Sequence, residues 1–278
     1  MIKVGEYQTL TIEREMPQGF YLTDAEDEEE VLLPRSFITE EMEVGKTIDV
    51  FVYCDSEERD IATTKKPLIT VGKFASLKVN SVNEFGAFCG WGVPKELLIP
   101  FSNQGRKLYP GQECVVYMYL DELSDRLVGT TKLRPFLQFT AKDIFSLGQE
   151  VDLLVYEETE IGYRVVILPN YHGLLYKNEL PGKLEIGQSL KGYIKPPRED
   201  GKIDVSVDPI GHQSITKNEK IIMDALEKNN GFIPFTDKSA PDAIREEFGI
   251  SKKLFKKILG SLYKQRLVIL EDKGVRKA

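Results

Sequence analysis

Four lysines near the C-terminal end of the chain have the type and spacing to bind phosphate. Lys252, Lys253, Lys256 and Lys257 recur at intervals that place them on the side of a predicted helix opposite its apolar stripe. Ammonium groups clustered in this way attract the phosphates of a nucleic acid. The alternative is a lysine-rich face that is only solvated. Arg, Asn and Gln are scarce beside these lysines, so specific reading of base edges is not expected.

The sequence carries none of the patterns that indicate an enzyme. Its two histidines are His172 and His212, and it has no HExxH motif, no glycine-rich phosphate loop and no nucleophile elbow. The three cysteines lack metal-binding spacing, and the acidic stretch from Asp24 to Glu30 is one loop rather than a converging set of ligands. We therefore predict that the protein is not an enzyme and has no catalytic residue, metal site or cofactor.

Charge is distributed unevenly along the 278 residues. The formal net charge is -7, which by itself argues against a polyanionic partner. The balance of Lys and Arg over Asp and Glu, however, is -10 for residues 1–70, +2 for 71–146, -4 for 147–212 and +5 for 213–278. We therefore expect the back half of the chain to attract nucleic acid more strongly than the front. The acidic loop at 24–30 is either a solvated hairpin end or an interaction or autoinhibitory feature.

The segment from Phe74 to Leu133 has the pattern of a small β-barrel. The alternating residues 76–80, the Phe-Gly-Ala-Phe run at 85–88 and the apolar run at 97–100 are each bounded by Gly, Pro or Asn. A Pro-Gly-Gln turn at 110–112 precedes two further β-rich runs, at 114–119 and 126–131. Five strands in about sixty residues match the size of an OB-type Greek-key barrel.

This segment resembles an S1 domain, the OB-fold module that binds RNA. The likeness rests on Phe-Gly-Ala-Phe in the second strand, Leu-Leu-Ile in the third, the Pro-Gly-Gln turn and the closing Arg-Leu-Val-Gly-Thr-Thr. Pro100 stands where S1 domains often carry histidine. The resemblance implies that Phe85 and Phe88 face the RNA and that Arg126 lies near them. Because residues three apart on an ideal strand point to opposite faces, one of the two rings should be core unless a bulge intervenes at Gly86.

The plan of this barrel recurs on both sides of it. Residues 7–69 repeat its landmarks at a constant distance, since Gly45 and Gly111, like Pro34 and Pro100, are 66 residues apart. A third copy follows at about 148–209, and the distance between its turn glycine and Gly111 is 76 residues. The added length lies in a connector whose aromatic and apolar residues predict that it is packed rather than free.

The third copy supplies further candidates for contact with RNA. Tyr163 lies in its second strand, and Tyr176 and Lys177 make its third strand aromatic and basic. The alternative is that one or two of the aromatic rings in this copy fill the interior of the barrel.

After residue 211 the periodicity changes from that of strands to that of helices. The pattern predicts a helix over 220–228, a second helix that starts near Pro241 and ends at Gly249, and a third helix capped by Ser251. Two β-rich runs, at 267–270 and 275–277, follow as a hairpin. Three helices and a hairpin make a winged helix, which would also suit duplex DNA.

The order of these modules resembles the conserved virulence factor B family of bacterial proteins. We predict a mainly β chain, with three tandem S1-like OB-fold β-barrels at 1–70, 71–146 and 147–212 and an α+β winged-helix domain at 213–278. The family resemblance implies binding of single-stranded RNA and post-transcriptional regulation in the cytoplasm. DNA binding through the winged helix and a protein-interaction scaffold are the alternatives. No run of about 18 apolar residues occurs, so no membrane contact is expected, and the oligomeric state is left open.

Overall fold

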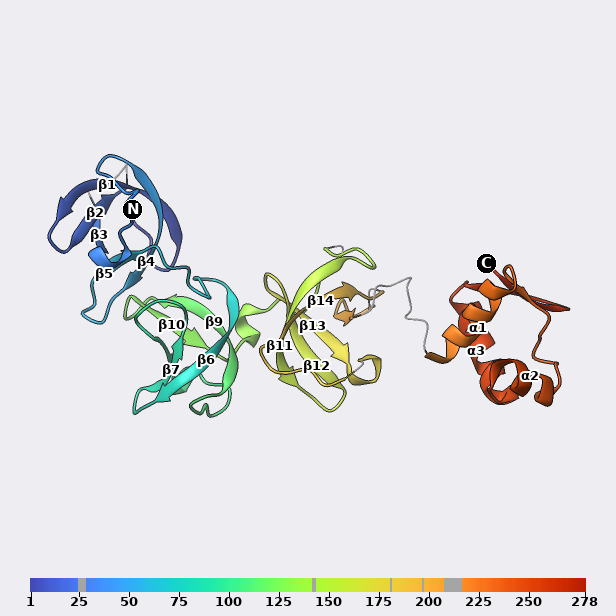
Figure 1. The fold of residues 1–278 in the computed structure, drawn as a ribbon. Coiled ribbons are helices and arrows are strands. Elements are labelled where there is room, and N and C mark those ends of the chain that lie inside the picture. The colour runs from blue at the N-terminus through green and yellow to red at the C-terminus, as the bar shows by residue number, and fades with distance from the viewer. Residues whose placement is uncertain (25–28, 142–143, 181, 197, 208–216) are drawn as a thin grey trace. The chain divides into compact units, whose positions relative to one another are not determined.

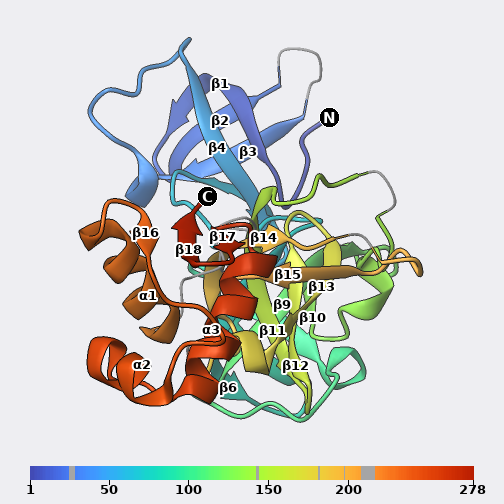
Figure 2. The ribbon, with the colours of Figure 1, turned by 90° about the vertical axis from the view of Figure 1, so that its right-hand side faces the viewer.

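The computed structural model describes residues 1–24, 29–141, 144–180, 182–196, 198–207 and 217–278. The chain divides into two compact units, Met1–Val207 and Asp208–Ala278 (Figures 1 and 2). Within the described residues, the first unit forms three closed five-stranded barrels and the second forms three helices with a three-stranded sheet. This confirms the predicted fold class. The predicted domain limit between 212 and 213, and His212 beside it, lie outside the described residues.

All three barrels have one strand order, in which the first strand pairs with the second and fourth and the third pairs in parallel with the fifth. The first barrel consists of β1 (Tyr7–Met16), β2 (Gly19–Thr23), β3 (Glu30–Pro34), β4 (Thr47–Cys54) and β5 (Asp60–Thr63). The second consists of β6 (Phe74–Val82), β7 (Gly86–Gly90), β8 (Leu97–Pro100), β9 (Glu113–Asp121) and β10 (Arg126–Thr130). The third consists of β11 (Glu150–Glu158), β12 (Gly162–Ile167), β13 (Tyr171–Tyr176), β14 (Ser189–Ile194) and β15 (Ile203–Ser206).

A bulge and a glycine turn recur at the same place in every barrel. The first strand shifts register just after Ile12, Val79 and Val155. The carbonyl oxygens of these three residues accept hydrogen bonds of 2.7–2.8 Å from the N–H groups of Gly45, Gly111 and Gly187. The glycines have φ between +85° and +90°, a conformation that costs other residues strain. The glycine found at this place in each copy of the sequence pattern therefore marks the same turn in every barrel.

The second strand of each barrel starts with glycine because the third strand passes too close for a side chain. A Cβ atom added at Gly19, Gly86 or Gly162 would lie within 2.3 Å of a backbone carbonyl oxygen of the third strand. The residue after each of these glycines points into the barrel, and the one after that points outward. Because side chains alternate along a strand, the position of the glycine determines which of the following side chains face the interior and which face outward.

The first and second barrels share a buried aromatic cluster. Phe51 and Tyr53 of β4 meet Trp91 edge to face, with ring centroids 5.7 and 6.2 Å apart. All three side chains are at most 2% exposed and belong to the same core cluster as the interior of the second barrel. Burial of aromatic surface on this scale holds the two barrels together.

The connector between the second and third barrels is packed, as predicted. Leu133 and Leu137 are buried in a cluster that includes side chains of β9, β11 and β12. Between them, the short 3-10 helix η3 (Arg134–Phe136) places the ring of Phe136 4.0 Å from that of Tyr117, in a stacked arrangement. The connector therefore fixes the positions of the side chains that it carries.

The second unit is a winged helix, built from α1 (Lys217–Lys228), β16 (Phe232–Ile233), α2 (Pro241–Phe248), α3 (Lys252–Lys264), β17 (Val268–Glu271) and β18 (Gly274–Lys277). Ser251 caps α3, since its Oγ accepts a hydrogen bond of 3.2 Å from the N–H of Leu254. The apolar stripe of α3 is buried against the other elements. The strand β16, which pairs with β18, was not predicted because two residues show no periodicity.

Candidate nucleic-acid interface

The second barrel and the edge of the first enclose a groove of about 570 Å³, here called the barrel-2 groove. Its walls bring together three of the residues predicted to contact RNA, namely Phe85, Phe88 and Arg126. Glu58, from the turn between β4 and β5, contributes the first barrel's side of the groove. The predicted ligand face of the second barrel is thus a single concave surface.

Neither phenylalanine belongs to the core. Phe88 is half-buried and points outward from β7, while its neighbours Ala87 and Cys89 are fully buried. Phe85 is 63% exposed because it precedes the strand, in a turn where its N–H donates to Oδ1 of Asn83 at 2.8 Å. The expectation that one ring must be core was wrong, since Phe85 does not follow the alternation of a strand. The register shift lies in β6, not at Gly86.

Arg126 does not face the groove alone, because its guanidinium group forms an ion pair and hydrogen bond with the carboxylate of Glu58. Both side chains are more than half exposed. An exposed ion pair of this kind contributes at most about 1 kcal/mol, so a phosphate can compete for the arginine. The acidic first barrel therefore supplies a counter-charge to the predicted RNA contact of the second.

Lys95 is a groove residue that the sequence analysis missed. Its Nζ donates a hydrogen bond of 2.6 Å to the carbonyl oxygen of Asp55, and its own carbonyl oxygen accepts from Nε1 of Trp91 at 2.5 Å. Only the packing of the first barrel against the second brings Lys95 to Asp55. The Trp-Gly-Val-Pro-Lys run at 91–95 gave no periodic signal of its own.

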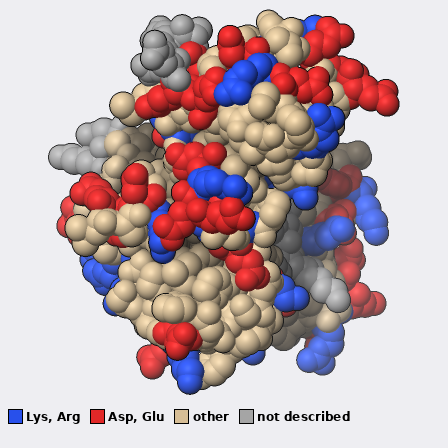
Figure 3. Space-filling model, turned by 90° about the vertical axis from the view of Figure 1, so that its left-hand side faces the viewer, with Lys and Arg blue, Asp and Glu red and all other residues tan. Residues whose placement is uncertain are grey.

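Acidic side chains gather over the first barrel, which fills the upper part of the view in Figure 3. Its β2 still presents an aromatic ring outward, that of Tyr21, but the guanidinium of Arg14 covers this ring at 4.2 Å. Arg14 is in turn paired with Glu30, and Arg59 with Asp55. The arginines of the first barrel, Arg35 included, are thus paired with its own carboxylates.

Tyr163 is not an RNA-facing residue, which corrects the prediction. It is 1% exposed, lies in the core of the third barrel and accepts a hydrogen bond of 3.3 Å from the N–H of Leu184 through its hydroxyl. The reason is register: Tyr163 directly follows Gly162, as Ala87 follows the glycine of the second barrel. Arg164 takes the outward place that Phe88 has there.

Tyr176 is the last residue of β13 and Lys177 follows it, and neither lines the barrel-2 groove. Tyr176 is half-buried, and its hydroxyl donates to Oδ2 of Asp204 at 3.3 Å. Lys177 is exposed and pairs with Glu158 at 2.7 Å. These two residues remain candidates for contact on the third barrel, but each already has a polar partner within it.

The four candidate lysines all lie in the first two turns of α3. Lys253, Lys256 and Lys257 are exposed and Lys252 is half-buried, opposite the buried stripe of the helix. Lys256 is 3.5 Å from Asp237, while the other three have no ion pair among the described residues. The predicted cationic face is therefore present, with Lys252 at its edge.

Comparisons with known proteins agree with this architecture. A model of the S1 domain matches residues 4–65 and 71–132, which are the first and second barrels, and a model of the CvfB-like winged helix domain matches residues 220–276. In its domain content the chain is CvfB-like. S1-type OB barrels and winged helices are binding modules, so this domain content places the chain in the nucleic-acid-binding class and fits a protein that is not an enzyme.

Relatives of the chain cover almost its whole length. An uncharacterized protein, YitL of Bacillus subtilis, is 29% identical over 98% of this chain and 92% of its own. Conserved virulence factor B of Staphylococcus epidermidis is 28% identical over 90% of this chain and 87% of its own. A Streptococcus pneumoniae structure, described as a multidomain protein with nucleic acid binding domains, is 24% identical over 99% of this chain and 98% of its own, with a TM-score of 0.47.

The residues that the structure describes include no group of side chains suited to a metal ion and no membrane-spanning helix. Among those residues no group of three or more His, Cys, Asp or Glu side chains is arranged to hold a metal ion. None of the described helices is long and apolar enough to cross a membrane.

Proposed function

We propose that the protein binds single-stranded RNA and acts as a post-transcriptional regulator in the cytoplasm. The observation that carries the binding proposal is the barrel-2 groove, where the rings of Phe85 and Phe88 lie with Arg126 on one concave surface. Bases stack on exposed aromatic rings while a cation holds the phosphate, and stacking contributes about 1–3 kcal/mol per base. The regulatory role and the location rest on the family resemblance.

The exposure of Phe85 supports a binding role rather than a structural one. An aromatic ring that is 63% exposed contributes little to the core, yet it stands beside a second outward ring and a basic residue. Single-stranded nucleic acid offers unstacked bases that can reach such a surface, whereas bases within a duplex cannot.

The winged helix adds phosphate contacts to those of the barrels. Lys252 and Lys253 occupy the first turn of α3, which has no acidic residue. Cations at a helix N-terminus oppose the helix dipole and cost about 0.3–1 kcal/mol each, so helix stability does not explain their position. Ammonium groups hold phosphates without reading sequence, which favours a non-specific contribution over duplex-specific readout.

Fluorescence anisotropy with single-stranded RNA, single-stranded DNA and duplexes of matched length tests the proposal. Phe85→Ala and Phe88→Ala should each weaken binding to single-stranded RNA by about 1–3 kcal/mol. Tyr109→Ala is the matched control, because this ring is 56% exposed but lies outside the groove. Melting temperatures measured in parallel show that the groove variants remain folded.

Other outcomes would replace the proposal with one of its alternatives. Preference for duplex DNA, unaffected by the groove substitutions, would point to a DNA-binding winged helix. Failure to bind any nucleic acid at low salt would leave a protein-interaction scaffold.

A further inference from the structure

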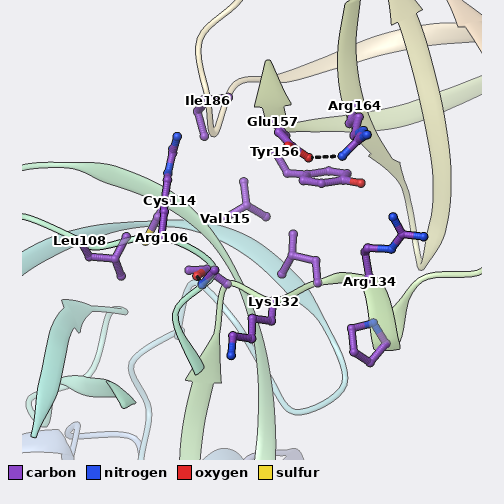
Figure 4. Close-up of a pocket in the computed structure, with 14 residues that line it drawn as sticks. Arg106, Leu108, Cys114, Val115, Lys132, Arg134, Tyr156, Glu157, Arg164 and Ile186 are labelled. Atoms are coloured by element: carbon purple, nitrogen blue, oxygen red, sulfur yellow. Dashed lines mark hydrogen bonds and ion pairs between the residues drawn. The ribbon is translucent and has the colours of Figure 1, made fainter. Parts of the chain in front are cut away.

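A second concave site lies where the third barrel meets the second barrel and its connector. This junction pocket has a volume of about 370 Å³ and is separate from the barrel-2 groove, with which it shares no lining residue. Arg106 comes from the loop before β9, Lys132 and Arg134 from the connector, and Arg164 from β12. Figure 4 shows Arg106 on one side of the pocket and Arg134 and Arg164 on the other.

The pocket is strongly cationic although the chain is acidic overall. Its lining contains four basic side chains and a single carboxylate, that of Glu157, which pairs with Arg164 at 2.7 Å. Arg106, Lys132 and Arg134 form no ion pair with any described residue. Three positive charges therefore remain without a neutralising partner around one small cavity.

The unpaired arginines are exceptional within the first unit. Its other six arginines each form an ion pair with a carboxylate: Arg14, Arg35, Arg59, Arg126, Arg164 and Arg198. Within the described residues of this unit, the two arginines without a carboxylate partner are Arg106 and Arg134, and both line the junction pocket. Guanidinium groups bind phosphate oxygens in bidentate fashion, so an anionic ligand would give both arginines the charged partner that they lack.

The other walls of the pocket are neutral or positive. Tyr156 lines it, and burial raises the pKa of this phenol to about 12, so the hydroxyl stays protonated. That hydroxyl lies 3.0 Å from Nδ1 of His172, whose pKa is lowered to about 4 by burial and by the charges of Arg164 and Arg134. Burial is the larger cause of this lowered pKa, and the two arginines of the pocket add to it.

Packing holds Arg134 in place, and the pocket is large enough for a small ligand. The side chain of Arg134 lies 4.9 Å over the ring of Phe139, and the connector that carries it is packed on both barrels. Leu108, Val115 and Ile186 give the pocket an apolar wall beside its cations. A cavity of a few hundred Å³ with an apolar wall and a few convergent charges accommodates a ligand as large as one nucleotide.

We propose that the junction pocket binds one nucleotide unit of single-stranded RNA, with its phosphate on the guanidinium and ammonium groups and its sugar or base against the apolar wall. The assignment rests on the proposed function and adds a second contact site to it. Arg106 and Arg134 are the principal phosphate ligands, because neither has a carboxylate to displace. A free nucleotide offers the same chemistry, so the test includes both sources.

The test compares the full-length double variant R106Q/R134Q with wild type. The matched control is R35Q/K46Q, which also removes two exposed charges, here from the first barrel, where they pair with Glu15 and Glu43. Anisotropy with a single-stranded RNA should show R106Q/R134Q binding about tenfold to a hundredfold more weakly than the control. Its salt slope should fall by up to about 0.7 per lost contact.

Titration with uridine 5′-monophosphate distinguishes the two sources of ligand. Loss of RNA affinity in R106Q/R134Q, with or without measurable binding of the mononucleotide, supports the proposal. Loss of mononucleotide binding with unchanged RNA affinity would overturn the RNA assignment in favour of a free nucleotide. Equal behaviour of R106Q/R134Q and R35Q/K46Q toward both ligands would overturn the pocket altogether.

The same experiment separates this proposal from the proposed function. If Phe85→Ala and Phe88→Ala leave RNA binding unchanged while R106Q/R134Q weakens it, the junction pocket binds RNA and the barrel-2 groove does not. If the phenylalanine variants weaken binding and R106Q/R134Q does not, the reverse holds.

Discussion

The two junctions of the barrel unit have opposite electrostatic character. At the junction between the first and second barrels, the arriving carboxylate of Glu58 pairs with Arg126 on the ligand face. At the junction between the second and third, Arg106 and Arg134 arrive beside Arg164 and raise the positive charge instead. Barrels of one topology thus differ in how well they can bind an anion. A carboxylate from the neighbouring barrel neutralises the arginine at the first junction, whereas the arginines at the second junction have no such partner.

The difference also shows how the two surfaces divide the work of binding. The barrel-2 groove has two outward rings. Its two cations are already engaged, Arg126 by the carboxylate of Glu58 and Lys95 by the carbonyl oxygen of Asp55, so its contribution should come mainly from stacking. The junction pocket has uncompensated cations, so its contribution should come mainly from phosphate and depend strongly on salt.

The largest expected effect comes from disabling both sites in one chain. Phe85→Ala combined with Arg106→Gln and Arg134→Gln should weaken binding to a long single-stranded RNA by about the product of the separate losses, about a hundredfold or more. The reason is that the sites share no residue and act on different parts of the ligand. Anisotropy titrations of the single, double and triple variants measure this.

If the triple variant loses no more RNA affinity than Phe85→Ala alone, binding is not divided between the barrel-2 groove and the junction pocket. Such a result would mean that the RNA uses one site at a time. A tetranucleotide serves as control, because it is too short to require both sites.

The second expected effect concerns the lysines of α3. Replacing Lys252, Lys253, Lys256 and Lys257 by glutamine should weaken RNA binding by about tenfold at low salt and lower the salt slope by up to about 0.7 per lost contact. Linked modules gain effective concentration from one another, so the loss should be larger in the full chain than the lysines would show in isolation. Titrations against several sequences over a range of salt concentrations measure it.

These lysine titrations also isolate the contribution of the barrels. With the lysines removed, the substitutions at the two junctions should account for most of the affinity that remains. An unchanged salt slope would show that the lysines are only a solvated face, and a loss confined to one duplex sequence would identify a specific DNA reader.

A smaller effect on RNA affinity, an increase instead of a loss, is expected at the junction between the first and second barrels. Glu58→Gln should strengthen RNA binding by up to about fivefold, because it releases Arg126 from an exposed ion pair worth up to about 1 kcal/mol. Glu57→Gln is the control, since Glu57 lies in the same turn but pairs with Arg59 and does not line the groove. Equal affinities for the two variants would show that Glu58 does not compete with RNA.

The smallest effect is on the pH dependence of stability. His172 faces Tyr156, Arg134, Arg164, Glu157 and Lys202, and burial with the arginine charges lowers its pKa to about 4 from 6.5. As the pH falls through 6.5 the unfolded chain takes up this proton first, so the free energy of unfolding should decrease between about pH 6.5 and 4. His172→Gln should remove that part of the decrease, as measured by urea unfolding.

The positive potential behind this shift can be tested separately. In an NMR titration the pKa of His172 should rise in Arg134→Gln, because one of the charges that lower it is gone. An unchanged pKa would mean that the charge of Arg134 does not reach His172, and it would weaken the contrast between the two junctions.

Much of the fold could be predicted because it depends on patterns of residues that are close in sequence. The turn glycines Gly45 and Gly111 mark the same recurring hydrogen bond, and the alternation around them predicts strands within a few residues of those observed. The cap at Ser251 was equally local. Each of these features depends on residues close in sequence, which is why spacing alone was sufficient.

The candidate site was less predictable, because it depends on register and on contacts between barrels. Tyr163 was misplaced since the sequence does not state which residue after Gly162 faces inward. The pairing of Glu58 with Arg126, and the convergence of Arg106 with Arg164, exist only once the barrels have packed together. No periodicity within one barrel could have indicated either.

The aromatic cluster of Phe51, Tyr53 and Trp91 has a consequence for cooperativity. Because these side chains from two barrels form one buried core, unfolding either barrel would expose apolar surface on the other. The two barrels should therefore melt in a single transition. A ligand held by the second barrel then stabilises the first by mass action, although the first need not touch it. The acidic first barrel would in this way share in the thermal protection that RNA confers.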